Sequence, residues 1–269
     1  MEIRLKAVET LLFKSDLVAI GKFRCPVTHP LYADSGPCSQ HTFVFPRTQT
    51  RIRHDGGASF VGNPNIVAFY NEGQRYTRTA ISEFDASDWY TIADDALLDL
   101  LDRDDPTRPF VTTHVGADAK TFVHQRMLFQ ALDAGAELDP LDVEESVLRF
   151  LGRVAVTPVR RRRHDAEAVE AVCEVVARDP AARLSLRELA RAGGISPFHL
   201  CRAFRANTGT TLTAYRHSLR LRLSLDPLRD RTVSLTDVAL DLGFSSHSHF
   251  TAIFRRHFGI TPSQFRATS

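Results

Sequence analysis

The chain has 269 residues, of which 43% are hydrophobic and 25% charged, so it is long enough for two domains with hydrophobic cores. Its four cysteines are too few for a disulfide scaffold, and no apolar run approaches the ~20 residues that cross a bilayer. The opening run MEIRLKAVET is charged from its second residue and does not have the pattern of a signal peptide. We therefore expect a reduced, cytoplasmic protein.

Charge is distributed unevenly along the sequence. Residues 181–269 carry 13 Arg, no Lys and 5 acidic residues, a net charge of +8. The remainder carries 21 basic and 27 acidic residues, a net charge of −6. This polarity suits a phosphate-binding module attached to a neutral-to-acidic domain.

From Phe23 to about Ala93 the sequence shows short strands separated by turns. TFVF precedes Pro46, TRIRH precedes Asp55-Gly56-Gly57, ASFV precedes Gly62-Asn63-Pro64, and NIVAFY precedes Asn71-Glu72-Gly73. Hairpin spacing of this kind predicts an antiparallel barrel or sandwich. Position in the strands makes His54, Arg53 and Tyr70 candidates for a pocket.

Four residues of this region are of the types that hold zinc, at the spacing C-x3-H-x8-C-x2-H: Cys25, His29, Cys38 and His41. The spacing matches no closed zinc site. We expect buried thiols and stacked or hydrogen-bonded histidines there, and neither a metal nor another cofactor.

Between about residues 94 and 153 the hydrophobic period becomes helical. One predicted helix places Phe122, Met127, Leu128 and Leu132 near one face. A second helix begins at Asp139-Pro140 and carries Val143, Val147, Leu148 and Leu151. The two helices could pair with another subunit or pack against their own strand domain.

Residues 154–165 read as a linker whose arginine run, Arg160 to Arg163, is either a solvated connection or a phosphate contact. A packing helix follows from Ala166 to Arg178, and its apolar residues are Val169, Val172, Cys173 and Val176.

A repeat occupies the basic end of the chain. Ser185, Ala190 and Gly194 recur 49 residues later as Ser234, Ala239 and Gly243, and Ser196, Phe204 and Gly209 recur 50 residues later as Ser246, Phe254 and Gly259. Each copy has serine caps, a glycine turn and an apolar stripe, which predicts a helix, a tight turn and a second helix. A helix from Thr211 through Leu223 would join the copies, and Pro227 should end or kink it.

In the second copy, GFSSHSHFTAIFRRHFGITP resembles the signature of the AraC/XylS family of bacterial transcription regulators. The resemblance covers residues 166–269 and, more loosely, the run FVFPRTQTRIRHDGGASF. It implies an α+β chain with a cupin-like, effector-sensing antiparallel β barrel over 1–93 and a helical dimerisation segment over 94–153. The linker over 154–165 then leads to an all-α DNA-binding domain over 166–269 with two helix-turn-helix units. A homodimer, a small-molecule effector and contact with RNA polymerase are the further implications.

The repeat and the resemblance together nominate residues that contact double-stranded DNA. In the first unit, Phe198, Cys201, Arg202 and Arg205 fall on the helix face opposite the apolar stripe, and Arg202 can donate two hydrogen bonds to guanine. In the second unit the set is His247, Ser248, Thr251, Ala252, Arg255 and Arg256. The family commonly has arginine where Ala252 stands, so this unit is expected to contribute thymine-methyl contact and phosphate anchoring. His249 is assigned to the surface or turn.

Two other functions compete with the ligand-responsive DNA-binding regulator that we favour. An enzyme built on the barrel would need a nucleophile elbow, a His-x-His metal motif or a phosphate loop, and the strand region from Phe23 to Ala93 has none of these. A regulator controlled by a protein partner instead of a small effector remains the second alternative.

Overall fold

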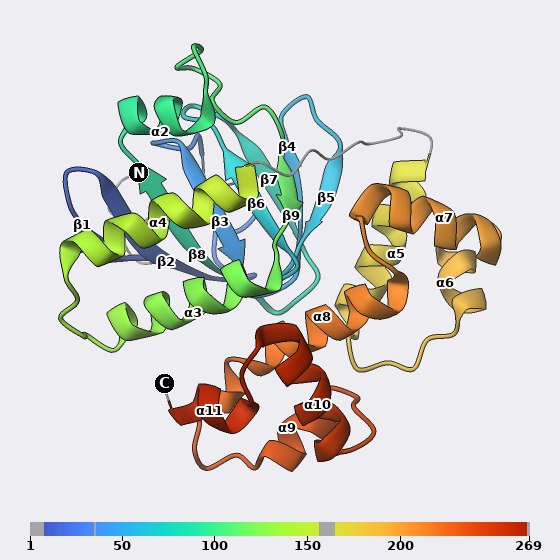
Figure 1. The fold of residues 1–269 in the computed structure, drawn as a ribbon. Helices are drawn as coiled ribbons and strands as arrows, with labels where there is room; N and C mark the ends of the chain where they lie inside the picture. The colour runs from blue at the N-terminus through green and yellow to red at the C-terminus, as the bar shows by residue number, and fades with distance from the viewer. Residues whose placement is uncertain (1–7, 35, 156–164, 268–269) are drawn as a thin grey trace. The chain divides into compact units, whose positions relative to one another are not determined.

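The computed structural model describes residues 8–34, 36–155 and 165–267. It divides into two compact units, Met1–Pro158 and Val159–Ser269, referred to below as unit 1 and unit 2 (Figure 1). Unit 1 contains the strands, and unit 2 is helical. The chain is therefore of the mixed α+β class, with a sheet domain followed by a helical one.

Unit 1 is built on two antiparallel sheets. The larger has the strand order β1-β2-β8-β3-β6-β9, and the smaller has the order β5-β4-β7. The strands are β1 (Glu9–Lys14), β2 (Val18–Pro26), β3 (Thr42–Pro46), β4 (Thr50–His54), β5 (Ser59–Gly62), β6 (Ile66–Tyr70), β7 (Tyr76–Ala80), β8 (Phe84–Ile92) and β9 (His114–Gly116).

The two sheets pack through apolar side chains instead of closing into a barrel. Ile52 and Phe60 of the small sheet form one buried cluster with Ile66, Ala68 and Tyr70 of the large sheet. No hydrogen-bonded ladder joins the two sheets within the described residues, so of the predicted barrel or sandwich the structure shows a two-sheet sandwich and no closed barrel. Two of the crossings between the sheets, from β3 to β4 and from β5 to β6, lie beside Pro46 and Pro64, which have no N–H to donate to a ladder.

Helices α3 (Ala119–Asp133) and α4 (Pro140–Ala155) lie across one face of the large sheet, and α2 (Asp94–Leu101) precedes them (Figure 1). Phe122 of α3 contacts Phe45 of β3, with ring centres 6.4 Å apart. Phe150 of α4 lies at the same distance from Tyr90 of β8. Both helices therefore bury their apolar faces within their own unit. Met127 and Leu128 are only half-buried, in contrast to the predicted stripe, and Gln125 and Arg126 are buried instead.

A buried charge network explains why polar residues face inward on α3. Asp88 of β8 accepts hydrogen bonds from Arg126 at 2.7 Å, Gln125 at 2.9 Å and Arg47 at 3.1 Å. Asp88 and Arg126 are both 0% exposed. Burial alone would raise the pKa of Asp88, but the Arg47 and Arg126 guanidinium groups hold it below its usual range. This network fastens α3 to the large sheet.

Unit 2 consists of short helices whose starts agree with the predicted caps. They are α5 (Ala166–Arg178), α6 (Leu186–Ala192), α7 (Pro197–Thr208), α8 (Leu212–Ser224), the 3-10 turn η2 (Pro227–Arg229), α9 (Leu235–Asp241), α10 (His247–Phe258) and α11 (Pro262–Ala267). Ser185, Ser196, Ser234 and Ser246 each accept the N–H of the residue three positions on. Among the described helices, none combines the length and apolar composition needed to cross a bilayer.

The repeat extends to backbone conformation. Gly194 and its equivalent Gly243 adopt φ values of 65° and 76°, and Gly209 and its equivalent Gly259 adopt 74° and 84°. These are left-handed conformations that glycine adopts without steric cost. Helix α8 connects the copies; it ends at Ser224, and Pro227 begins η2, in agreement with the predicted break. Its 13 residues make a rod of roughly 20 Å.

Candidate nucleic-acid interface and ligand cavity

Helix α7 has one buried and one exposed face. Leu200, Ala203 and Phe204 are buried against the rest of unit 2, so the opposite face is turned to solvent. That face carries all four predicted contact residues of the first copy, namely Phe198, Cys201, Arg202 and Arg205. The Phe198 side chain is 75% exposed, and the Arg202 guanidinium carbon lies 6.0 Å from the centre of its ring.

Helix α10 repeats the arrangement with different side chains. Phe250, Phe254 and Phe258 are buried, and Ser248, Ala252, Arg255 and Arg256 are exposed. His247 and Thr251 are half-buried, with Nε2 of the histidine 3.3 Å from Oγ1 of the threonine. His249 is exposed, and its Nδ1 lies 3.1 Å from the Ser245 Oγ in the turn.

Not every arginine of the basic end faces solvent. Arg216 donates to the carbonyl oxygen of Leu184 at 3.3 Å. Its repeat equivalent Arg266 donates to the carbonyl oxygen of Val233 at 2.9 Å. Leu184 and Val233 are themselves equivalent, so each copy uses one arginine to hold the residue before its first cap. These two arginines therefore stabilise the fold of unit 2, a role that their spacing in the sequence did not indicate.

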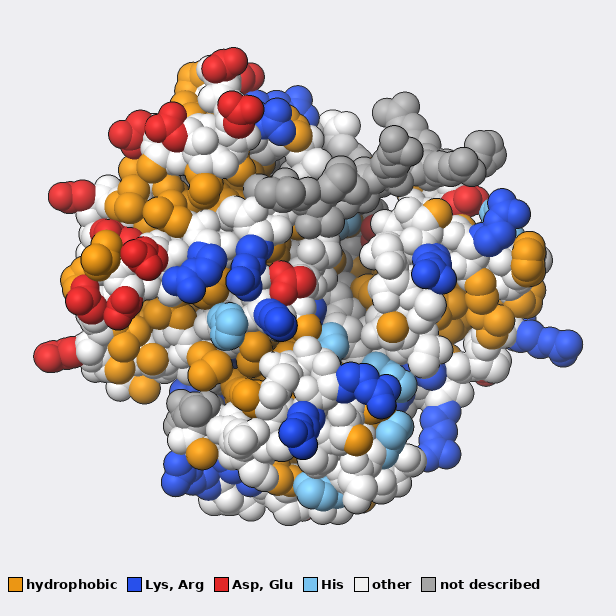
Figure 2. Space-filling model, in the orientation of Figure 1, with side chains coloured by type: hydrophobic (Ala, Val, Ile, Leu, Met, Phe, Trp, Pro, Cys, Tyr) orange, Lys and Arg blue, Asp and Glu red, His pale blue; other side chains and the backbone are white. Residues whose placement is uncertain are grey.

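Arg220 of α8 ties the two copies together. It is 5% exposed and donates to the carbonyl oxygen of Gly243 at 2.9 Å. Its other donors reach the carbonyl oxygens of Ala181 at 3.0 Å, of Ala182 at 3.1 Å and of Pro180. The turn before α10 is thereby fastened to the segment after α5. Figure 2 shows the arginine and histidine side chains that remain exposed over the unit 2 helices.

The four residues considered as zinc ligands are not brought together. His41 accepts the N–H of Glu72 at Nδ1, and its Nε2 lies 2.9 Å from the Pro106 carbonyl oxygen. His29 accepts the N–H of Leu31 at Nδ1. Burial raises the pKa of the Cys38 thiol to about 12, which disfavours the thiolate that zinc requires. Across the described residues, no group of three or more His, Cys, Asp or Glu side chains is placed to hold a metal ion.

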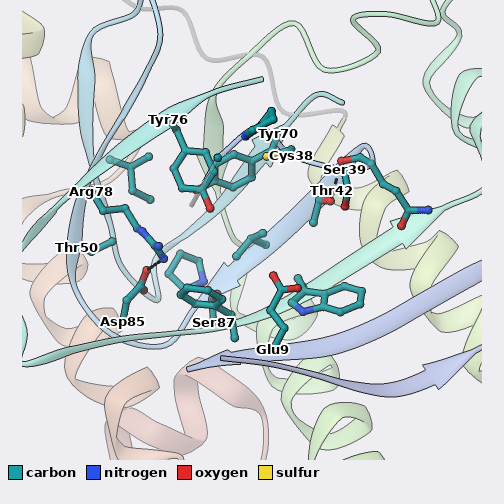
Figure 3. A pocket seen from close by; sticks show the side chains of 18 of the residues that line it. Glu9, Cys38, Ser39, Thr42, Thr50, Tyr70, Tyr76, Arg78, Asp85 and Ser87 are labelled. Carbon is teal, nitrogen blue, oxygen red and sulfur yellow. Dashed lines mark hydrogen bonds and ion pairs between the residues drawn. The ribbon is translucent and has the colours of Figure 1, made fainter. Parts of the chain in front are cut away.

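Unit 1 contains a cavity of about 170 Å³ that opens between its two sheets (Figure 3). Its wall is contributed by residues from most of the strands: Glu9, Phe23, Gly36, Pro37, Cys38, Ser39, Gln40, Thr42, Val44, Pro46, Thr50, Ile52, Tyr70, Tyr76, Arg78, Asp85, Ser87, Trp89 and Thr91. Of the pocket candidates named from sequence, only Tyr70 lines it. His54 is buried with its ring centre 4.9 Å from that of Tyr70, and Arg53 is exposed.

The one arginine of the cavity wall is held by neighbouring protein groups. Arg78 donates to Asp85 Oδ2 at 2.9 Å and to the carbonyl oxygens of Tyr32 at 2.7 Å and Leu31 at 2.8 Å. Its guanidinium carbon also lies 4.6 Å from the centre of the Phe23 ring. Tyr76 and Arg78 stand two residues apart on β7, so their side chains lie on the same face of the strand. This alternation in the sequence could have identified both as residues of the cavity wall.

Comparisons with known proteins match the C-terminal part of the chain best. A family model described as a helix-turn-helix domain matches residues 189–268. The probable transcription factor PqrA of Proteus vulgaris is 39% identical over 83 residues, which are 31% of this chain and 68% of that protein.

Two further matches cover different shares of this chain. The HTH-type transcriptional regulator RipA of Corynebacterium glutamicum is 33% identical over 160 residues, 60% of this chain and 44% of that protein. Among solved structures, a transcriptional regulator with an AraC-type DNA-binding domain from Chromobacterium violaceum is 31% identical. That match has a TM-score of 0.36 and covers 37% of this chain and 89% of the other.

Proposed function

Because this chain belongs to the AraC/XylS family of DNA-binding transcription regulators, we propose that α6–α7 and α9–α10 are two helix-turn-helix units that read operator DNA. We propose further that a small molecule in the unit 1 cavity controls this reading. The observation that carries the proposal is the exposed face of α7, where an aromatic ring and two arginines stand opposite a buried apolar stripe. The protein then acts as a regulator in the cytoplasm and not as an enzyme.

The first unit supplies base recognition. Arg202 can place its planar fork against O6 and N7 of a guanine in the major groove. The neighbouring Phe198 ring limits the orientations of that guanidinium through a cation–π contact, and it can itself touch a thymine methyl group. Arg205 lies one turn further along the helix and reaches phosphate. Cys201 completes the same face.

The second unit supplies anchoring. At the positions equivalent to Phe198 and Arg202 it carries Ser248 and Ala252, which cannot reproduce the ring or the fork. Arg255 and Arg256, with the Thr251 hydroxyl, are suited to phosphate oxygens, and Ala252 is suited to a thymine methyl group. His247 sits beside Thr251 and adds a donor to the same face.

Two substitutions separate the two roles. We expect Arg202→Ala to relax the preference at one position of the bound sequence and to cost ~1–3 kcal/mol on the preferred duplex. Arg255→Ala should weaken all duplexes alike and lower the slope of log affinity against log salt concentration by about one. Selection of bound duplexes from a random pool measures the first effect, and a salt titration on the selected duplex measures the second. An unchanged selected sequence for Arg202→Ala would contradict the role given to α7.

The remaining assignments concern regulation. We propose that residues 1–93 sense the effector and that residues 94–153 mediate homodimerisation. Residues 154–165 then link these functions to residues 166–269, which bind DNA. The DNA-bound protein contacts RNA polymerase. Residues 156–164, which include Arg160 to Arg163, lie outside the described residues. The apolar faces of α3 and α4 are already used inside unit 1, so a dimer contact would use their outer faces. Sedimentation of the purified chain with and without its DNA tests this point.

A further inference from the structure

The wall of the unit 1 cavity identifies the chemical class of its ligand. We propose that the cavity binds a small organic cation, a single aromatic ring bearing a protonated amine, and discriminates against carboxylates of the same size. The inference deepens the proposed effector control and rests on it for its regulatory meaning. The binding itself depends on the cavity alone.

Size limits the ligand first. The cavity holds about 170 Å³. An engineered protein cavity of about 150 Å³ accommodates benzene, so this cavity has room for one ring and a few further atoms. A fused-ring or long-chain molecule exceeds this volume and would extend out of the cavity.

Aromatic side chains make up much of the wall. Phe23, Tyr70, Tyr76 and Trp89 all line the cavity, and the rings of Tyr70 and Tyr76 lie 4.7 Å apart, centre to centre, at 53°. Tilted aromatic faces of this kind pack against a flat ring. They also attract a cation, because the face of an aromatic ring is electron-rich.

The charges of the wall favour a cation over an anion. Arg78 is satisfied by Asp85 and by two carbonyl oxygens, so the two opposite charges offset each other. The third charged residue, Glu9, stands on β1 with its carboxylate directed toward the cavity (Figure 3). No hydrogen bond or ion pair of the Glu9 side chain is found among the described residues. The wall therefore carries one excess negative charge.

Tyr70 supplies a second polar group for the ligand. Its side chain is 6% exposed, and within the described part of the chain its hydroxyl has no hydrogen-bond partner. Because a phenol hydroxyl can both donate and accept, a polar group of a ligand in the cavity can hydrogen-bond to it. An ammonium group can donate to both the Glu9 carboxylate and this oxygen. A carboxylate in the same place would face the excess negative charge of Glu9, and repulsion would disfavour it.

Three probes of nearly equal size test the proposal on the purified full chain: benzylamine, benzyl alcohol and benzoate. We expect benzylamine to raise the midpoint of thermal unfolding and to give a measurable Kd by calorimetry, with benzyl alcohol weaker and benzoate inactive. Glu9→Gln should weaken benzylamine by about tenfold, the loss of one charge-assisted contact. Glu83→Gln removes the same charge from an exposed residue outside the wall and should leave the Kd unchanged.

The inference is overturned if benzoate binds as tightly as benzylamine, if Glu9→Gln leaves the benzylamine Kd unchanged, or if benzylamine does not bind at millimolar concentration. DNA binding is measured on the same preparations. If the selected duplex binds normally while benzylamine does not bind, the cation inference fails and the DNA-binding function stands. If benzylamine binds but no duplex is preferred over another, the proposed function fails instead.

Discussion

Asp88→Asn is expected to lower the free energy of unfolding of unit 1 by about 3–5 kcal/mol, the usual cost of removing one partner from a buried ion pair. The carboxylate is fully buried and faces both Arg47 and Arg126. An asparagine keeps the shape but removes the negative charge that the two guanidinium groups face. Urea unfolding followed by the fluorescence of Trp89, the single tryptophan of the chain, reports on unit 1 directly.

The matched control is an exposed pair in the same unit. Asp34 lies 3.4 Å from Arg75, with both side chains more than half exposed. Asp34→Asn makes the same chemical change and should cost no more than about 1 kcal/mol. Equal losses for the two variants would show that the Asp88 network contributes little beyond a surface pair.

The pH dependence of stability gives an independent reading of Asp88. Its pKa is lowered in the folded state, so it binds fewer protons there than in the unfolded chain at mildly acid pH. Its contribution is therefore fully present above the ordinary aspartate pKa of about 3.9 and is lost as the pH falls through the lower, folded-state pKa. We expect the wild-type protein to lose stability steeply in this acid range. Asp88→Asn should show a shallower dependence.

Local signals made unit 2 predictable from the sequence. Caps such as Ser196 and Ser246 and turns such as Gly194 and Gly243 depend on residues within a few positions, and the helical period marks the buried stripes directly. The repeat doubled these signals. The sequence spacing could not distinguish arginines that stabilise the fold from arginines that face solvent. Arg220 and Arg216 donate to carbonyl oxygens that are distant in the sequence.

Unit 1 was less predictable because its structure depends on pairing between distant segments. β8 lies between β2 and β3, and nothing in the individual strands specifies that order. Arg126 faces inward on α3 only because Asp88, 38 residues earlier, is there to receive it. The cavity wall combines Glu9 of β1 with Arg78 of β7 and Trp89 of β8, and of its residues only Tyr70 was named from its strand position.

Gly243→Ala is the second large effect that we expect, a loss of about 2–5 kcal/mol in the stability of unit 2. Two costs combine at this turn. The φ of 76° is left-handed, which costs a non-glycine residue about 1–2 kcal/mol. An added Cβ would also lie 2.5 Å from the Ala181 carbonyl oxygen, and overpacking of this kind typically costs about 1–3 kcal/mol. Far-UV circular dichroism during urea unfolding measures the loss of the helices.

The repeat supplies the control that separates these two costs. Gly194 is the equivalent residue of the first copy, with a φ of 65° but no atom within 4 Å of an added Cβ. Gly194→Ala should therefore show the backbone cost alone, and the difference between the variants measures the contact with Ala181. Because Arg220 binds the Gly243 carbonyl oxygen, the larger displacement should also shift the cap of α10 and weaken DNA binding. Equal losses in stability and unchanged DNA affinity for both variants would mean that this contact does not fix the second recognition helix.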